Sequence, residues 1–204
     1  GSVANVEAFN VLLTGSGDDR IANTGAANAE SVGGGAGDDI VTWIHKGDDS
    51  VDGGADADLL KLVFSSTVGS VGLSSFGGDA ASGYAGYYDG SGSDNFSFAG
   101  IERFDLTFTG TGNSTLRGGD NDDTLAGGAQ GDNLNGFGGD DLLKGGVGND
   151  TIAGGAGTDL LVADFSTATT GIVSALTNGV DGASGTYGNT AAFKIAFTGI
   201  ETFS

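Results

Sequence analysis

A nine-residue repeat runs six times without a break through residues 109 to 162 of the chain. Its sixth position reads Ser114, Asp123, Asp132, Asp141, Asp150 and Asp159. Its eighth position is always aliphatic and reads Leu116, Leu125, Leu134, Leu143, Ile152 and Leu161. A disordered tract rich in Gly and Asp would keep no such phase. The pattern therefore predicts a regular repeat structure rather than disorder.

Each repeat has room for one tight loop and one short strand. Glycines at the first, second and fourth positions allow positive φ and a sharp turn. The remaining residues form a strand whose alternation sends the eighth residue inward. Two repeats then make one coil, so repeats of the same parity stack on the same side. We expect an all-β fold, a right-handed parallel β-roll or β-helix solenoid with a thin aliphatic core.

The same stacking would arrange the acids in two columns. Asp132 would lie above Asp150 in one column, and Asp123, Asp141 and Asp159 would form the other, at the strand spacing of about 4.8 Å. Two bare carboxylates at that distance repel by roughly 3 kcal/mol at an effective dielectric of about 20. Calcium would remove this repulsion, because it accepts about six to eight oxygen ligands in a flexible geometry.

A less regular array of the same kind occupies residues 14 to 61, where the copies begin eleven, nine, ten and nine residues apart. Its sixth positions are Asp19, Glu30, Asp39, Asp49 and Asp58, and its eighth positions are Ile21, Val32, Val41, Val51 and Leu60. The insertions at Asn23-Thr24 and at Trp43 are expected to form bulges or wider loops. The Glu30 and Asp49 pair is the least regular, because Glu30 is longer than Asp and its loop has Asn28 where Gly is usual.

Calcium ligands are expected at two kinds of position in these arrays. The predicted carboxylate ligands are Asp19, Glu30, Asp39, Asp49, Asp58, Asp123, Asp132, Asp141, Asp150 and Asp159. The predicted loop carbonyls are those of Gly15, Gly17, Gly35, Gly37, Gly47, Gly54, Asp56, Gly110, Gly112, Gly119, Asn121, Gly128, Gln130, Gly139, Gly146, Gly148, Gly155 and Gly157. Counting same-side pairs of acids gives about six calcium ions.

The pattern resembles the hemolysin-type RTX repeat, G-G-x-G-x-D-x-U-x, in which U is a large aliphatic residue. The resemblance covers residues 14 to 61 and 109 to 162. It implies segments that are disordered without calcium, and a fragment of a large bacterial protein exported through a type I secretion channel. It therefore implies a secreted, extracellular or bacterial cell-surface location.

Larger-scale repetition predicts two similar modules. An Ile/Val-Glu-x-Phe element begins at Val6, Ile101 and Ile200, and each array ends in Asp-Leu-Leu followed by Phe-Ser. We expect a first module at 1–100, with a leading strand at 3–13, repeats at 14–61 and a spacer at 62–100. The second module would span 101–204, with a leading strand at 101–108, repeats at 109–162, a spacer at 163–199 and the start of a next unit at 200–204. The spacers are expected to be β-rich caps or bridges, either continuing the coil or forming a separate small sheet.

The composition limits the classes of molecule that the chain could bind. Twenty-seven acidic and seven basic side chains give a formal charge of −20, which argues against nucleic acid or an anionic membrane as a partner. The chain has no Cys, so no disulfide supports the fold, and calcium would take that role. It has no transmembrane run or secretory signal, so no membrane insertion is expected. It has no Met either, which predicts a processed form or a fragment.

No enzyme motif is visible, and we predict that the chain is not an enzyme. The single His45 has no second His for a zinc site, and neither H-E-x-x-H nor G-x-S-x-G occurs. A catalytic carboxylate pair needs only one copy, whereas these acids recur every nine residues. His45 is expected to matter through its backbone, and Trp43 is expected to pack against a loop edge.

Three tyrosines in the first spacer have two interpretations. Tyr84, Tyr87 and Tyr88 could form a platform for stacking sugars, or they could pack within a cap. The Gly-Thr-Tyr sequence ending at Tyr187 resembles Gly83-Tyr84, which favours packing for Tyr84. Tyr87 and Tyr88 have no evident counterpart.

The sequence thus predicts a calcium-binding RTX structural module of a large secreted or cell-surface protein, of adhesin or surface-layer type. It would fold into stiff β-rolls on binding extracellular calcium. The alternatives are an accessory calcium-binding module of a secreted lipase, protease or polysaccharide-modifying enzyme, and a carbohydrate-binding module. The expected partners are calcium ions, neighbouring modules of the same parent chain and, for the last alternative, carbohydrate.

Overall fold

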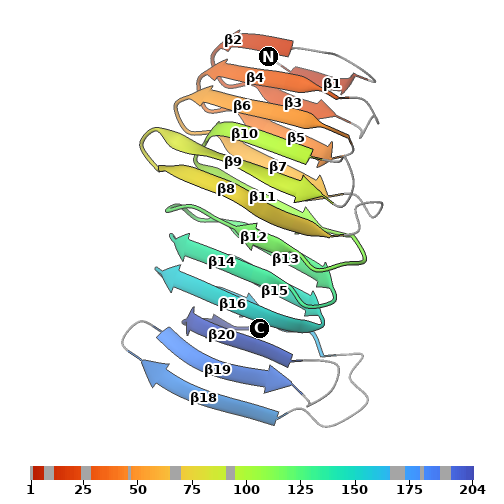
Figure 1. The fold of residues 1–204 in the computed structure, drawn as a ribbon. Helices are drawn as coiled ribbons and strands as arrows, with labels where there is room; N and C mark the ends of the chain where they lie inside the picture. The colour runs from red at the N-terminus through yellow and green to blue at the C-terminus, as the bar shows by residue number, and fades with distance from the viewer. Residues whose placement is uncertain are drawn as a thin grey trace.

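The computed structural model describes residues 2–6, 12–23, 29–45, 47–64, 70–90, 95–165, 173–179, 182–188 and 194–204. Over these residues the chain forms twenty-one strands and no helix, so the described part contains no helix long and apolar enough to span a membrane. Figure 1 shows the strands stacked into an elongated solenoid with two faces. The predicted all-β parallel roll is confirmed.

One nine-stranded sheet, which we call the long sheet, runs the length of the solenoid. Its strands, in spatial order, are β1 (Ser2–Val6), β3 (Arg20–Asn23), β5 (Ile40–His45), β7 (Leu59–Phe64), β11 (Arg103–Phe108), β13 (Thr124–Ala129), β15 (Leu142–Val147), β17 (Leu160–Val162) and β21 (Thr202–Phe203). Every neighbouring pair in this sheet is parallel.

Two six-stranded sheets form the opposite face. The first contains β2 (Leu12–Ser16), β4 (Ser31–Ala36), β6 (Asp49–Ala55), β10 (Asn95–Ile101), β9 (Gly83–Gly90) and β8 (Val71–Asp79). The second contains β12 (Thr115–Arg117), β14 (Asn133–Gly138), β16 (Asn149–Ala156), β20 (Lys194–Ile200), β19 (Gly182–Gly188) and β18 (Val173–Gly179). The two sheets meet at a parallel bridge between Val71 and Ser114.

The spacers extend one face of the solenoid. In each spacer the middle strand pairs antiparallel with both of the others: β9 pairs with β8 and β10, and β19 pairs with β18 and β20. The last of each three then pairs in parallel with an array strand, β10 with β6 and β20 with β16. On the long sheet β7 pairs directly with β11, so this sheet continues past the first spacer without interruption. Figure 1 shows β8 and β9 lying on the opposite face at this level.

The aliphatic columns lie where the repeat predicts. Leu116 pairs in register with Leu134, and Leu134 with Ile152. On the long sheet Leu125 pairs with Leu143, which pairs in turn with Leu161. All six side chains are buried. The prediction that repeats of the same parity stack on one side is therefore confirmed.

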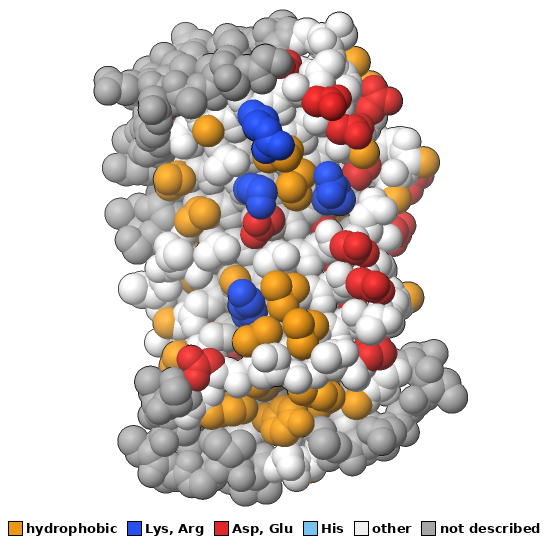
Figure 2. All heavy atoms as spheres, turned by 180° about the vertical axis from the view of Figure 1, so that it is seen from behind, with side chains coloured by type: hydrophobic (Ala, Val, Ile, Leu, Met, Phe, Trp, Pro, Cys, Tyr) orange, Lys and Arg blue, Asp and Glu red, His pale blue; other side chains and the backbone are white. Residues whose placement is uncertain are grey.

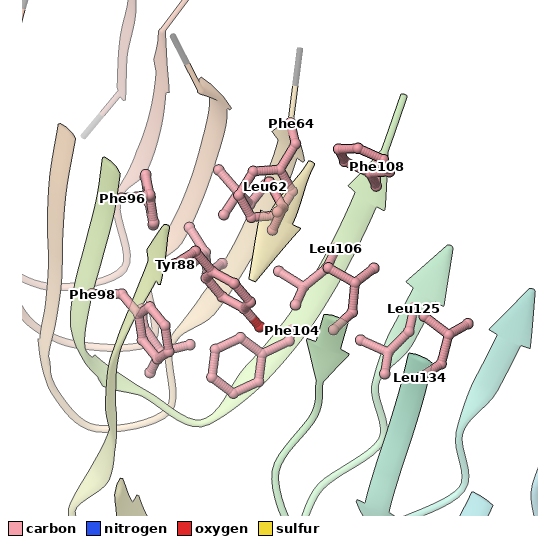
Figure 3. Close-up of a cluster of buried hydrophobic side chains, with 14 of the residues drawn as sticks. Leu62, Phe64, Tyr88, Phe96, Phe98, Phe104, Leu106, Phe108, Leu125 and Leu134 are labelled. Carbon is pink, nitrogen blue, oxygen red and sulfur yellow. The ribbon is translucent and has the colours of Figure 1, made fainter. Parts of the chain in front are cut away.

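An aromatic core joins the two arrays, and we call it the aromatic junction. Its buried members are Trp43, Phe64, Tyr88, Phe96, Phe98, Phe104 and Phe108. The ring centroids of Phe64 and Tyr88 lie 5.2 Å apart, and those of Phe98 and Phe104 lie 5.4 Å apart. Figure 3 shows the rings of Phe64, Tyr88, Phe96, Phe98, Phe104 and Phe108 in the interior, followed by Leu106 of β11 and by Leu125 and Leu134 of the second array. The core is therefore aromatic at this junction and aliphatic in the repeats on either side of it, which we call the aliphatic arms.

Two sequence predictions at β5 are wrong. Trp43 is fully buried in the core rather than at a loop edge, and the ring of His45 is also fully buried. The cause is the insertion, which lengthens β5 without a bulge. Residues 40 to 45 pair in unbroken register with residues 59 to 64. Alternation then sends both side chains inward beside Val41. The predicted features at Glu7, Thr24 and Asn28 lie outside the described residues.

The register also corrects the pairing of the tyrosines. Tyr88 stacks on Phe98 at 5.8 Å, and Tyr187 stacks on Phe197 at 5.4 Å. Tyr88 pairs across the hairpin with Phe96, just as Tyr187 pairs with Ile195. The counterpart of Tyr187 is therefore Tyr88 and not Tyr84. The rings of Tyr84 and Tyr88 are buried, so neither presents a face on which a sugar could stack.

Candidate metal sites

The sixth-position acids form hydrogen-bonded ladders along the solenoid. One carboxylate oxygen of each acid accepts the backbone N–H of the equivalent residue in the preceding coil. The donor and acceptor pairs are Asp19 to Asp39 (2.8 Å), Asp39 to Asp58 (2.8 Å), Asp123 to Asp141 (2.9 Å), Asp141 to Asp159 (3.0 Å) and Asp132 to Asp150 (3.0 Å). The residues lie in the columns that the nine-residue phase predicts. Each acid is thereby fixed at the start of its strand.

The second oxygen of most of these carboxylates has no hydrogen-bond partner. Among the described residues, seven buried acids share this feature: Glu30, Asp39, Asp58, Asp132, Asp141, Asp150 and Asp159. A buried carboxylate oxygen without a partner is costly, because it has lost its hydration and gained nothing in return. A cation bound along the columns would supply the partner that this recurring oxygen lacks.

The first-position glycines leave space beside these unpaired oxygens. A Cβ on Gly127 would lie 2.6 Å from Oδ2 of Asp132 and 2.5 Å from the carbonyl oxygen of Gly145 in the next coil. The same combination of an unpaired carboxylate oxygen and a carbonyl from the next coil recurs at Gly34, Gly53, Gly136 and Gly154. Oxygens from two coils thus converge at a place where no side chain fits. An all-oxygen donor set of this kind suits calcium.

These first-position carbonyls are candidate calcium ligands that the sequence analysis missed. They matter because carboxylates alone are too sparse to bind an ion. Nowhere in the described residues do three or more His, Cys, Asp or Glu side chains gather into a metal-binding group. Each candidate site therefore combines a carboxylate with backbone oxygens.

The predicted carbonyls at the second and fourth positions belong to stacked turns. Thirteen of these residues have positive φ: Gly17, Gly35, Gly37, Gly47, Gly54, Asp56, Gly128, Gln130, Gly139, Gly146, Gly148, Gly155 and Gly157. Gly15, Gly110, Gly112, Gly119 and Asn121 do not. Phe137 has a φ of 80° at a second position, and the guanidinium of Arg117 lies 3.6 Å from the centre of its ring. That cation–π contact helps to offset the backbone strain.

Two glutamates that the sequence analysis did not assign to the columns belong to them. Oε2 of Glu102 accepts the N–H of Asp58 at 2.7 Å, and Oε2 of Glu201 accepts that of Asp159 at 2.8 Å. The long-sheet column therefore continues past Asp159. The recurring Ile/Val-Glu-x-Phe element is the signal that could have identified them.

Three column positions differ from the rest. Ser114 stands at the head of its column, where its N–H donates to Oδ1 of Asp132 at 2.6 Å. Both oxygens of Asp123 accept backbone N–H groups, from Phe104 and Gly119, each at 2.6 Å. Asp49 accepts the N–H of Glu30 at 3.3 Å through Oδ1, and its Oδ2 is bonded to side chains of β5.

Burial raises the pKa of most column carboxyls. Removal from water is the largest cause throughout, and it raises the pKa of Asp58 and Asp123 to about 7 and that of Asp132 to about 6. The pKa of Asp141 rises to about 8, because the charges of Asp123 and Asp159 add to its burial. The pKa values of Glu30, Asp39, Asp150 and Asp159 are raised as well, again chiefly by burial. Without a cation, ionisation of these carboxyls therefore destabilises the folded state.

We expect the calcium-free fold to be more stable near pH 5 than near pH 8. A carboxyl whose pKa rises on folding binds a proton more tightly in the folded state, so its contribution is fully present below its ordinary pKa. That contribution is lost as the pH rises through about 6 to 8, the folded values of Asp132 and Asp141. Thermal denaturation with a chelator at several pH values measures the trend. A calcium-free midpoint that increases across this window would contradict the burial of these charges.

A second acidic row is exposed. The fifth-position residues form their own ladder, in which Asp38 donates its N–H to Asp18 at 3.1 Å and Asp140 donates to Asp122 at 2.7 Å. All four side chains are solvent-exposed. Figure 2 shows acidic side chains gathered along one edge of the molecule, while the few basic ones lie on its face. This edge attracts cations toward the loops but contains no buried unpaired carboxylate.

The RTX calcium-binding nonapeptide repeat is the family whose model matches the chain, in four copies over residues 45–60, 104–134 and 135–165. These segments contain five of the acids with an unpaired oxygen: Asp58, Asp132, Asp141, Asp150 and Asp159. The repeat is a structural calcium-binding unit rather than a catalytic one. No curated protein matches the chain.

Proposed function

Since the chain is an RTX-type protein, we propose that it is a calcium-dependent structural module of a larger protein that works outside the cell, of adhesin or surface-layer type. The observation that carries the proposal is the row of seven buried carboxylate oxygens without a partner. A module of this kind would provide a stiff spacer, since one of its faces is a continuous nine-stranded parallel sheet.

The proposed ligands are the unpaired carboxylate oxygens and the carbonyls that face them. They comprise the acids Glu30, Asp39, Asp58, Asp132, Asp141, Asp150 and Asp159, and the carbonyls of Gly53, Gly100, Gly145, Gly154 and Gly199. One ion at each unpaired oxygen gives at most seven, close to the number of about six expected from same-side pairs. We also propose the division into modules at 1–100 and 101–204.

In the folded state the chain's own residues shape each site. The ladder hydrogen bond holds Oδ1 of each column Asp toward the preceding coil, which leaves Oδ2 directed at the loop. The first-position glycine keeps the space beside Oδ2 open. Bound calcium supplies the positive charge that neutralises the column. The hydrophobic column then packs, because the coils on either side no longer repel each other.

Calcium affinity links folding to location. At about ten times the dissociation constant, each independent site stabilises the fold by roughly 1.4 kcal/mol. Extracellular calcium modules bind with dissociation constants of about 10⁻⁴ to 10⁻³ M, far above cytosolic calcium. A chain with such sites would stay unfolded in its arrays until it leaves the cell. Export before folding is thus the proposed order of events.

A calcium titration followed by circular dichroism tests the proposal. We expect a weak β signal in a chelator and a strong one in millimolar calcium. Magnesium should substitute poorly, because it prefers smaller octahedral sites and keeps its water. A full β spectrum that persists after verified removal of metal, with no further change on adding calcium, would refute calcium-dependent folding.

A further inference from the structure

Asp49 occupies a regular column position but differs from the other column acids. Its neighbour Ser50 pairs with Ser31 in β4, and Asp49 itself pairs with Phe96 in β10, so its register is that of an array. Its carboxylate is buried. In the seven acids described above the second oxygen has no partner, whereas Oδ2 of Asp49 does. The difference lies in what faces the carboxylate.

Two side chains from the facing sheet bind this oxygen. The indole Nε1 of Trp43 donates to Oδ2 of Asp49 at 3.0 Å, and Nδ1 of His45 lies 3.1 Å from the same atom. An ionised carboxylate can only accept hydrogen bonds, so Nδ1 of His45 carries the proton. Two N–H groups thus point at the place where the other repeats leave an unpaired oxygen. The partial positive charges of these two N–H groups stabilise the carboxylate of Asp49, as a bound cation would stabilise the carboxylates of the other repeats.

The first-position glycine that leaves space beside a column oxygen is also missing in this repeat. The first and second positions of the copy that contains Asp49 are Ile44 and His45, where most other copies have glycine. These residues belong to β5 instead of a loop. The space that Gly127 or Gly136 leaves beside a column oxygen therefore has no equivalent here.

The two side chains that bind Asp49 pack within the aromatic junction. The ring of His45 meets Phe64 edge-on at 5.7 Å and Phe96 at 5.4 Å. Figure 3 shows Phe64 and Phe96 within the same cluster as Tyr88 and Phe98. Aromatic burial stabilises the fold without any metal, because each ring removes about 150 to 250 Å² from water. The aliphatic arms bury only one large side chain per repeat.

On the other side of the junction Asp123 is satisfied in a similar way. Its two oxygens accept the N–H groups of Phe104 and Gly119, so it too lacks an unpaired oxygen. Asp58 keeps one and marks the point where the calcium-dependent column of the long sheet reaches the junction. Carboxylates facing the aromatic core are thus mostly neutralised by N–H donors, and those in the arms are not.

We propose that Asp49 is not a calcium ligand, and that the strands around it and the aromatic junction form a metal-independent nucleus from which the calcium-dependent arms fold outward. The nucleus comprises β5, β6, β7, β8, β9, β10 and β11. The proposal rests on the calcium function proposed for the arms. It adds that in the repeat of Asp49 the indole of Trp43 and the imidazole of His45 take the place of a calcium ion.

Calcium stoichiometry of the full chain separates Asp49 from a neighbouring acid. We expect Asp49→Asn to bind as many ions as the wild type by equilibrium dialysis, and Asp39→Asn to bind one fewer. Asp39 is the matched control, because it lies in the same array and has an unpaired oxygen. Loss of one ion in Asp49→Asn would overturn the proposal. A wild type that binds no calcium would instead refute the proposed function.

Hydrogen exchange on the wild-type chain in a chelator tests the nucleus without any variant. We expect at least tenfold slower amide exchange in residues 40–45, 49–64, 83–90 and 95–108 than in residues 127–162, and little difference once calcium is added. Equal exchange in the two regions without calcium would overturn the proposal. Trp43→Phe keeps a buried ring but removes the indole N–H. It should lower the calcium-free protection of the nucleus while leaving the number of bound ions unchanged, and a lost ion would count against the proposal.

Discussion

Asp141→Asn will increase the folded fraction of the calcium-free chain and destabilise the calcium-bound one. The Asp141 side chain is buried, one of its oxygens has no partner, and burial together with two acidic neighbours raises its pKa to about 8. Asparagine removes the charge and can still accept the N–H of Asp123 through Oδ1. Its amide nitrogen would take the place of the unpaired oxygen, close to the carbonyl of Gly154.

The two effects have opposite signs because the carboxylate of Asp141 is a buried unpaired group without calcium and a calcium ligand with it. Without calcium, relieving one buried unsatisfied group should stabilise the fold by about 1 to 3 kcal/mol. With calcium at about ten times its dissociation constant, losing one site should cost roughly 1.4 kcal/mol. The β signal in a chelator and the thermal midpoint in millimolar calcium measure the two terms separately.

Asp140→Asn is the matched control. Asp140 is adjacent and exposed, and its Oδ1 accepts a ladder N–H from Thr158 at 2.8 Å, which asparagine also can. It should change neither measurement by more than about 0.5 kcal/mol. If Asp141→Asn shifted both measurements in the same direction, the account of the buried column would be wrong.

Gly136→Ala will destabilise the calcium-bound fold by about 3 kcal/mol or more and remove one ion. The new Cβ would collide with Oδ2 of Asp141 and lie 2.6 Å from the carbonyl oxygen of Gly154. It would fill the space on which those two oxygens converge, and rigid backbone cannot move aside cheaply. Overpacking of this kind usually costs about 1 to 3 kcal/mol, to which the lost ion adds. Urea denaturation in millimolar calcium gives the change in free energy.

Gly138→Ala controls for the added methyl group. Gly138 lies in the same strand, and the nearest atom to its Cβ would be the Cα of Asp120 at 3.4 Å, an ordinary contact. Its effect should be small and the ion number unchanged. Equal losses in the two variants would show that strand β14, rather than the converging oxygens, sets the cost.

The periodicity predicts most of the fold because nearly every repeat has an acid at its sixth position and an aliphatic residue at its eighth. Leu125 and Leu143 were placed on one sheet, and Leu116 and Leu134 on the other, from parity alone, and the register confirms both pairs. The ladder through Asp141 follows from the same phase. A fixed number of residues per half-coil leaves little freedom, so local pattern and tertiary position agree.

The misplaced residues are those at which the phase breaks. The insertion at Trp43 was expected to widen a loop, yet the strand absorbed it because inward burial of an indole and an imidazole gains more than a bulge would. Glu102 was interpreted as part of a leading strand, since its distance from Asp58 along the chain hides their direct pairing. The first-position carbonyls were missed because the repeat gives the order of the loop residues but not the direction in which each carbonyl points.

Anomalous scattering from crystals grown in millimolar calcium would locate the bound ions. We expect a calcium peak beside the unpaired oxygen of Glu30, Asp39, Asp58, Asp132, Asp141, Asp150 and Asp159. We expect no peak beside Oδ2 of Asp49, which Trp43 and His45 already bind. A map with no peaks along the columns, or with peaks only on the exposed row of Asp18, Asp38, Asp122 and Asp140, would refute calcium binding by the buried carboxylates.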